Sequence, residues 1–242
     1  MDHTHLMRRA VAEALGTGLL VAVVVGSGIA ASRLSRDAGI QLLANSSATA
    51  FGLTVLILLF GPLSGAHFNP MVSLVDAVLG RRTRSGLPAM ETIVYVMVQT
   101  VGAIGGAVLA NLMFDAPTAW STTERVGAGV LLGEVVATAG LILLVVGLAR
   151  TGAGLIAAPA IGAYIGAAYW FTSSTSFANP AVTVGRMFTD TFAGIAPSSA
   201  LAFLAAQLVG AALGAALAAL LFPRARAGAP TADDVVVPQT IS

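Results

Sequence analysis

Long runs of apolar residues recur along the chain and are separated by short polar stretches. Each run has about the 20 residues that an α-helix needs to cross roughly 30 Å of hydrocarbon. The pattern therefore predicts an all-α membrane protein with six spanning helices. We place them at residues 10–31, 40–60, 89–114, 126–149, 152–171 and 198–222. The first run contains Glu13 and is longer than the apolar core of a signal peptide, so we interpret it as a retained span.

Two shorter apolar segments lie between the second and third runs and between the fifth and sixth. Each has a polar loop, an Asn-Pro pair and then about ten helix-compatible residues, in SGAHFNPMVSLVDAVL from Ser64 and STSFANPAVTVGRMF from Ser174. Asn is a preferred helix N-cap and Pro is favoured at the first helical position, so Asn69 and Asn179 mark helix starts. Because the segments are too short to span, they predict re-entrant half-helices.

The two halves of the chain repeat one another. Residues 99–114 and 207–222 share ten identities in sixteen positions at a separation of 108, and the two Asn-Pro pairs lie 110 residues apart. Each half has three spans, an odd number, so the second copy must enter the membrane from the opposite side. We expect one channel domain over residues 1–222, built of inverted repeats at 8–114 and 126–222.

Composition and charge exclude several function classes. Of the residues, 57% are hydrophobic and 10% charged, against roughly a quarter charged in soluble domains. The formal net charge of +1 gives no basic face for nucleic acid. With no Cys and three unclustered His residues, we expect no metal site, no cofactor and no enzymatic activity.

The arginines predict the orientation, because short cytoplasmic loops carry the positive excess. An inside N-terminus puts eight arginines on the cytoplasmic side and three on the outer side. The eight are Arg8, Arg9, Arg81, Arg82, Arg84, Arg150, Arg224 and Arg226, and the three are Arg33, Arg36 and Arg125. We expect a multi-pass protein of the plasma (inner) membrane with both termini cytoplasmic, and a disordered tail over residues 223–242.

An inverted pair of half-helices would bring two helix N-termini together near the membrane centre, with both positive dipole ends at one point. Side-chain oxygens that cap the helices leave the amide groups of Asn69 and Asn179 as fixed donors. A cation there meets two positive ends and no carboxylate, whereas a neutral solute with an acceptor oxygen is accepted. The residues thus predict a pore for small uncharged solutes.

These motifs resemble the aquaporins, the major intrinsic protein family of water and solute channels. The resemblance covers residues 8–222 and includes AEALGTG from Ala12, AFGLTVLILLFGPLSGAHFNP from Ala50, Gln99, Gln207 and Glu134. It implies the bilayer, water and small neutral solutes as partners, a pore in every subunit and a homotetramer.

The two Asn-Pro-Ala (NPA) signatures depart from the family pattern. The first reads Asn69-Pro70-Met71, and we favour packing against neighbouring helices for Met71 over a place at the constriction. The second, Asn179-Pro180-Ala181, is followed by Val182, where the family has a filter arginine.

By the same resemblance, Phe51, Ser176 and Val182 fall at selectivity-filter positions. The fourth position is Ala167 by one count and Tyr169 or Trp170 by another, and we favour the latter two. Without an arginine or histidine the filter is expected to be less polar and wider than a water filter.

Five further residues carry polar chemistry. We hypothesise that Arg186 and Asp76, each seven residues after a motif Asn, mark the outer and inner vestibules; ion pairing or a helix-end position is an equal alternative. The resemblance gives Glu13 and Glu134 the task of holding the re-entrant loops, which we favour over a proton relay because the spans contain no basic partner. His67 is expected to hold its loop or to line the inner pore.

Together these features predict a passive channel for water and small uncharged solutes, such as glycerol-like polyols and arsenous acid. TSFANPAVT resembles bacterial relatives associated with arsenic handling. The alternatives are a gradient-coupled transporter and a non-conducting structural membrane protein.

Overall fold

A computed structural model of the chain describes residues 3–81 and 85–223. Arg82, Arg84 and the predicted tail from residue 224 onward lie outside the described residues. Six helices are long and apolar enough to cross a membrane, as predicted, and the described residues contain no strand. These helices are α1 (His3–Leu34), α2 (Ala38–Ser64), α4 (Ala89–Met113), α5 (Ala128–Thr151), α6 (Ala157–Phe171, after the 3₁₀ turn η1, Gly154–Ile156) and α8 (Pro197–Leu221).

The two predicted half-helices are present and begin at the predicted prolines. They are α3 (Pro70–Gly80) and α7 (Pro180–Gly185), the latter continued by the 3₁₀ turn η2 (Arg186–Phe188). The Asn69 side-chain oxygen accepts from the Met71 backbone N–H at 2.9 Å, and the Asn179 oxygen accepts from the Ala181 N–H at 3.0 Å. Each Asn thus satisfies an N–H that has no partner within its own helix.

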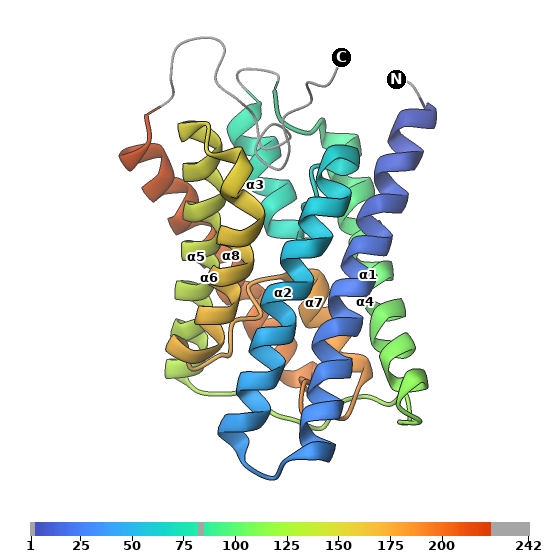
Figure 1. Ribbon diagram of the computed structural model, residues 1–242. Coiled ribbons are helices and arrows are strands. Elements are labelled where there is room, and N and C mark those ends of the chain that lie inside the picture. Colours follow the sequence, from blue (N-terminus) through green and yellow to red (C-terminus); the bar gives the residue numbers. More distant parts are fainter. Residues whose placement is uncertain (1–2, 82–84, 224–242) are drawn as a thin grey trace.

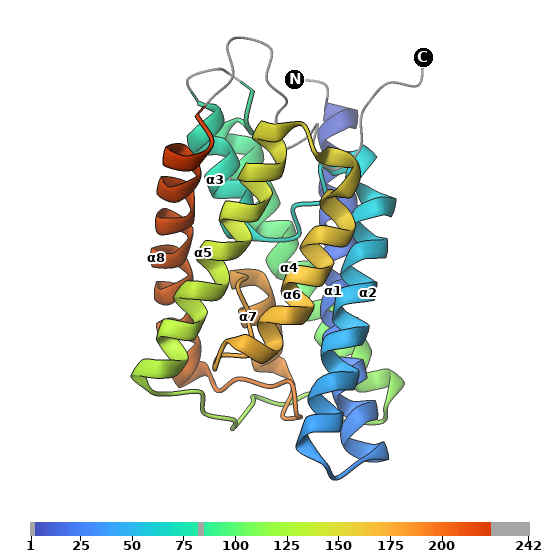
Figure 2. The ribbon, with the colours of Figure 1, turned by 60° about the vertical axis from the view of Figure 1, so that its left-hand side comes forward.

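The long helices stand side by side, with α3 toward the end of the bundle where α1 begins and α7 toward the opposite end (Figure 1 and Figure 2). The beginning of α1 and the end of α8 lie at the same end. This arrangement is what an inverted repeat requires.

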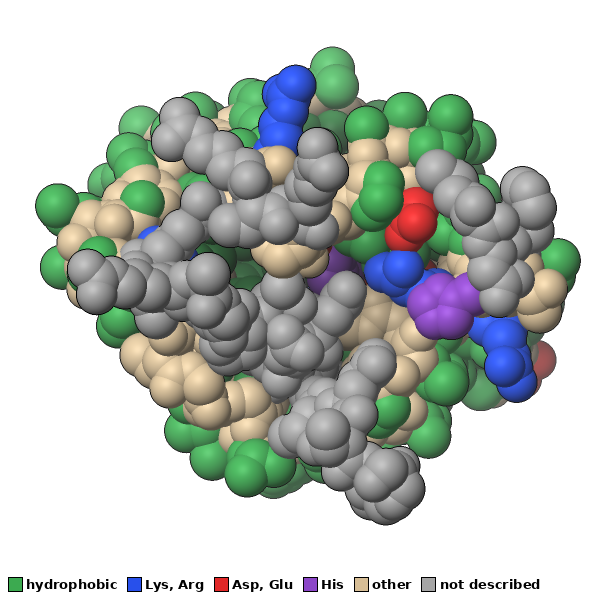
Figure 3. Space-filling view, turned by 90° about the horizontal axis from the view of Figure 1, so that it is seen from above, with side chains coloured by type: hydrophobic (Ala, Val, Ile, Leu, Met, Phe, Trp, Pro, Cys, Tyr) green, Lys and Arg blue, Asp and Glu red, His purple; other side chains and the backbone are tan. Residues whose placement is uncertain are grey.

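The outer face of the bundle is apolar. Seen from the end where α1 begins, hydrophobic side chains occupy much of the rim (Figure 3). Val101 is 69% exposed and Leu59 is 59% exposed, although both are large hydrophobic residues. A ring of exposed apolar side chains suits a surface that faces lipid rather than water.

The same helix crossing occurs once in each repeat, between α1 and α4 and between α5 and α8. A Cβ atom added at Gly106 would lie 2.0 Å from the Gly18 carbonyl oxygen, and one added at Gly214 would lie 2.4 Å from the Ala139 oxygen. The backbones therefore approach too closely for any side chain. These two close helix crossings determine the positions of the long helices between which the half-helices pack.

Candidate functional site

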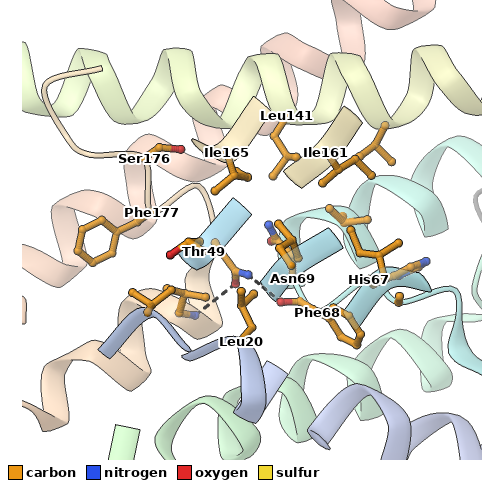
Figure 4. A pocket seen from close by; sticks show the side chains of 18 of the residues that line it. Leu20, Thr49, His67, Phe68, Asn69, Leu141, Ile161, Ile165, Ser176 and Phe177 are labelled. Atoms are coloured by element: carbon orange, nitrogen blue, oxygen red, sulfur yellow. Dashed lines mark hydrogen bonds between the residues drawn. The ribbon is translucent and has the colours of Figure 1, made fainter. Parts of the chain in front are cut away.

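A cavity inside the bundle is lined by residues from both repeats. In Figure 4, Leu141, Ile161 and Ile165 lie on one side of Asn69 and Leu20 on the other. Most lining side chains are apolar. The polar ones are Thr49, His67, Asn69, Tyr169, Ser176, Asn179 and Arg186. A mostly apolar lining with a few polar groups gives a solute few places to bind tightly.

The two motif asparagines are bonded to each other's loops. The Asn69 amide donates to the Ala178 carbonyl oxygen at 2.8 Å, and the Asn179 amide donates to the Phe68 oxygen at 2.7 Å. Both amides are fixed donors directed away from their own helices, as the sequence predicted, and each finds an acceptor in the opposite loop. Because an amide NH2 carries two donors, each Asn uses one across the repeat boundary and keeps the other at the cavity that it lines.

Both loops before the asparagines contain left-handed backbone at matching positions. Ala66 and Phe68 have φ of 48°, and Ser176 and Ala178 have φ of 51° and 48°. Non-glycine residues adopt this conformation at a cost, so it persists only where the surroundings hold it.

Glu13 of α1 holds the first loop. Its carboxylate accepts from the backbone N–H groups of His67 at 2.9 Å and Phe68 at 2.7 Å. The Gln99 amide and the Ser64 hydroxyl also donate to it, each at 2.7 Å. Four donors satisfy a carboxylate that is fully buried.

Glu134 of α5 occupies the equivalent place in the second repeat. It accepts from the backbone N–H groups of Phe177 at 3.2 Å and Ala178, and from the Gln207 amide at 2.7 Å. Gln207 also donates to the Thr183 hydroxyl at 2.8 Å, which ties the loop to α7.

The structure separates the predicted filter residues into two groups. Tyr169, Ser176 and Val182 line the cavity. Phe51 is 74% exposed and Trp170 is 51% exposed, so their assignment to the filter is wrong. Ala167 is also exposed. Successive side chains of α6 point in different directions, and of the three candidates Ala167, Tyr169 and Trp170 only Tyr169 lines the cavity.

Thr49 lines the cavity where Phe51 was expected. It is 2% exposed, and its hydroxyl lies 3.2 Å from the Tyr169 hydroxyl. Two residues along an α-helix differ by about 200° in direction, so an error of two positions moves a side chain from lipid to pore. The same stretch also contains Asn45, Ser46, Ser47 and Thr54, so polarity alone did not single out Thr49.

The other predicted site residues are placed as follows. Met71 is buried against Val72 and Ile142, which is a packing position. The Asp76 carboxylate accepts from the Leu87 backbone N–H at 2.8 Å and does not line the cavity described above, and its place at the inner vestibule stays a prediction. His67 lines the cavity, and its Nδ1 atom lies 3.0 Å from the Ser73 hydroxyl.

Two buried polar atoms in the cavity lining have no hydrogen-bond partner among the described residues. They are His67 Nε2 and Ser176 Oγ. Buried polar atoms are nearly always paired, so these two are positions where water or a solute hydroxyl would bind.

Arg186 lies in the cavity lining and is 2% exposed. It was expected at an open outer vestibule, and the structure instead buries it beyond Val182. Within the described residues, no cluster of potential metal ligands is present.

A loop outside the membrane-spanning segments carries one carboxyl group with a shifted pKa. Asp190 accepts from the Thr122 backbone N–H at 2.8 Å and from its hydroxyl at 3.0 Å, and these bonds lower the pKa of the carboxyl. The bonds join the loop after η2 to the loop between α4 and α5.

Comparison with known proteins gives consistent results. A family model described as Major intrinsic protein matches residues 1–178. Aquaglyceroporin AqpS of Rhizobium meliloti is 51% identical over 93% of this chain and 95% of its own length. Aquaporin Z of Brucella melitensis is 33% identical over 87% and 96%. The X-ray structure of the aquaglyceroporin from Plasmodium falciparum superposes with a TM-score of 0.64 at 21% identity, covering 88% of this chain and 95% of that one, which bears on the fold alone.

Proposed function

The chain belongs to the major intrinsic protein family, and from this premise we propose which solutes it conducts and how. Proteins of this family are membrane channels for water and small neutral solutes such as glycerol, not enzymes. We propose that this channel passes glycerol-sized polyols and neutral metalloid hydroxides such as arsenous acid, together with water.

The observation that carries the proposal is Val182 in the lining of the cavity. Its isopropyl group is small and apolar, and it directly follows the second motif, where the resemblance places a filter arginine. Without a guanidinium at this point, the passage is wider and binds water less strongly. A polyol can then present hydroxyls to the asparagine amides and its carbon backbone to the apolar side.

Flux measurements on proteoliposomes test the proposal. Vesicles with the full chain, its Val182→Arg variant or its Val182→Leu variant receive a hypertonic jump of impermeant osmolyte, glycerol or arsenous acid. We expect Val182→Arg to slow glycerol and arsenous acid entry by about fivefold or more, since even one methylene in a pocket is worth about 1–3 kcal/mol. Val182→Leu adds side-chain volume without charge, so it separates the effect of a narrower passage from the effect of the positive charge.

Native vesicles that pass water alone, or no solute, contradict the proposed substrate range. Glycerol flux that depends on an imposed proton or sodium gradient would favour a coupled transporter instead. Unchanged solute entry in the Val182→Arg variant would show that Val182 does not limit the passage.

We further propose that the channel assembles as a homotetramer in the plasma membrane. The long helices expose apolar residues, and this surface can pack against lipid on one side and against neighbouring subunits on another. Both contacts are compatible with a symmetric oligomer. Native mass spectrometry of the purified protein with bound lipid tests this assembly, and a monomer as the main species contradicts it.

A further inference from the structure

Arg186 is held in place by contacts that are not ion pairs. Its guanidinium carbon lies 3.5 Å from the centre of the Phe177 ring. Its Nε–H donates to the Ala193 carbonyl oxygen. Stacking and one backbone bond orient a guanidinium without neutralising it.

A second arginine approaches the same ring. The Arg125 guanidinium carbon lies 5.1 Å from the Phe177 ring centre. Its Nε donates to the Gly194 carbonyl oxygen at 2.9 Å and its Nη2 to the Phe192 oxygen at 3.3 Å. Three successive carbonyls, at residues 192–194, thus orient two guanidinium groups around one aromatic side chain.

Neither arginine has an ion-pair partner in the part of the chain that the structure describes. Glu134, whose carboxylate is bonded to the same loop, is occupied by the N–H groups of Phe177 and Ala178 and by Gln207. The charge of Arg186 is therefore uncompensated by direct contact, although the side chain is almost fully buried. Burial of an unpaired charge is costly, and such charges within membranes mark sites of function.

The position of Arg186 decides what this charge does. It lies four residues after Val182, one helical turn farther along, and both line the cavity. The Ser176 hydroxyl, which has no partner among the described residues, lines the same cavity. A fixed positive charge in a low-dielectric passage repels cations strongly and attracts oxygen acceptors.

We propose that Arg186 and Ser176 form a solute-recognition site beyond Val182, in which Arg186 excludes cations and both residues bind an oxygen of the permeating polyol. Phe177 and Arg125 are positioning residues for this site. The proposal deepens the channel function proposed above and rests on it. It also separates two tasks: Val182 keeps the passage wide, and Arg186 keeps it closed to cations.

The test measures cation leak and solute entry in the same proteoliposomes. The variants are Arg186→Gln, which can still donate to the Ala193 oxygen, and Arg186→Lys, which keeps the charge. Arg33→Gln is the matched control, because Arg33 also lies over a phenylalanine ring, at 5.5 Å from the centre of Phe114, but is exposed and absent from the cavity lining. Water flux reports whether each variant is folded.

We expect Arg186→Gln to raise the proton or sodium leak by about tenfold or more, which corresponds to the loss of a modest repulsion. Arg186→Lys and Arg33→Gln should stay at the native leak. Adding Val182→Arg to Arg186→Gln should restore cation exclusion, because the charge returns to the passage one turn away. Ser176→Ala should lower glycerol entry and leave the cation leak unchanged.

An unchanged cation leak in Arg186→Gln vesicles with normal water flux overturns the inference. Failure of Val182→Arg to restore exclusion, or failure of Arg186→Gln to fold while Arg186→Lys folds, assigns Arg186 a structural role and overturns it as well. Absence of solute entry in native vesicles contradicts the proposed substrate range instead, so the two failures are distinguishable.

Discussion

At the scale of single residues, the loops depend on two buried carboxylates. Glu13 and Glu134 are fully buried, and each accepts from two backbone N–H groups of a loop that contains left-handed residues. The N–H groups are thereby satisfied, and the loop carbonyls stay free to face the passage or the opposite asparagine.

Replacing Glu134 by Gln should therefore destabilise the protein. The new amide group turns a donor toward one of the N–H groups of Phe177 and Ala178 or toward Gln207, so that at least one buried donor loses its acceptor. The expected cost is about 1–3 kcal/mol. The measurement is the thermal unfolding midpoint in detergent together with water flux.

Glu124→Gln is the matched control, since Glu124 is exposed in the loop between α4 and α5. Its midpoint should equal the native one. A Glu134→Gln protein with native midpoint and flux would show that the loop does not need the carboxylate.

The roles of residues were predictable where a sequence motif identifies the position. They were not predictable where the position had to be found by counting residues along an apolar helix. Asn69 and Asn179 cap their helices as predicted because capping is a local property of the sequence. Phe51 was misplaced because rotation about an apolar helix is decided by packing against α1 and α6, which composition does not encode. Thr49 takes its place for the same reason.

At the scale of helices, the glycines in the α1–α4 crossing set the distance between two backbones. Gly106 has the Gly18 carbonyl oxygen 2.0 Å from where its Cβ would be, whereas Gly105, the preceding residue, has nothing within 4 Å. Two adjacent glycines on one helix therefore face opposite environments.

Gly106→Ala should push α1 and α4 apart and lower the stability of the protein by about 1–3 kcal/mol, as overpacking does. Gly105→Ala should leave stability within about 0.5 kcal/mol. Folded yield and thermal unfolding in detergent measure both. Equal behaviour of the two variants would mean that the crossing adapts to a methyl group.

The number of helices followed from the sequence, but some of their boundaries did not. The segment after Asn179 was expected to give about ten helical residues, and α7 has six before η2 tightens the chain. The Arg186 carbonyl accepts from the Ile195 N–H at 3.3 Å, a partner in the loop that follows η2. The first helix begins at His3 because the polar residues before the apolar run extend it beyond the membrane core.

At the scale of the whole molecule, the two ends of the bundle differ in the loops that they carry. The loop between α4 and α5 lies at the end opposite the beginning of α1, and the turn between α5 and α6 lies near that beginning (Figure 1). The arginine distribution predicts that the latter end faces the cytoplasm.

The chain contains no Cys, so single cysteines report orientation directly. We expect Ala119→Cys, in the α4–α5 loop, to react with an impermeant maleimide on intact cells. Leu155→Cys, in the turn before α6, should react only after the membrane is opened. The reverse pattern contradicts the proposed orientation.

The inverted repeat was visible in the sequence, whereas the connections between its halves were not. Similar segments at a constant separation in the sequence reveal the duplication. The hydrogen-bond partners of the Asn69 and Asn179 amides depend on how closely the two loops approach in the folded protein, which the sequence does not show. The half-helix of the second repeat also packs on a helix of the first, because a Cβ added at Gly185 would lie 2.6 Å from the Ala103 oxygen of α4.

The reciprocal bonds of Asn69 and Asn179 have a consequence for biogenesis. When the first half of the chain has entered the membrane during synthesis, the Asn69 amide and the Phe68 carbonyl still lack the partners supplied by residues 178 and 179. An unpaired polar group in hydrocarbon is costly, so the early loop must remain hydrated or be shielded until translation has nearly ended. Chains stalled before residue 178 should therefore label rapidly at Ala66→Cys, and full-length chains slowly. Each half of the protein thus supplies hydrogen-bond partners that the loop of the other half needs in order to fold.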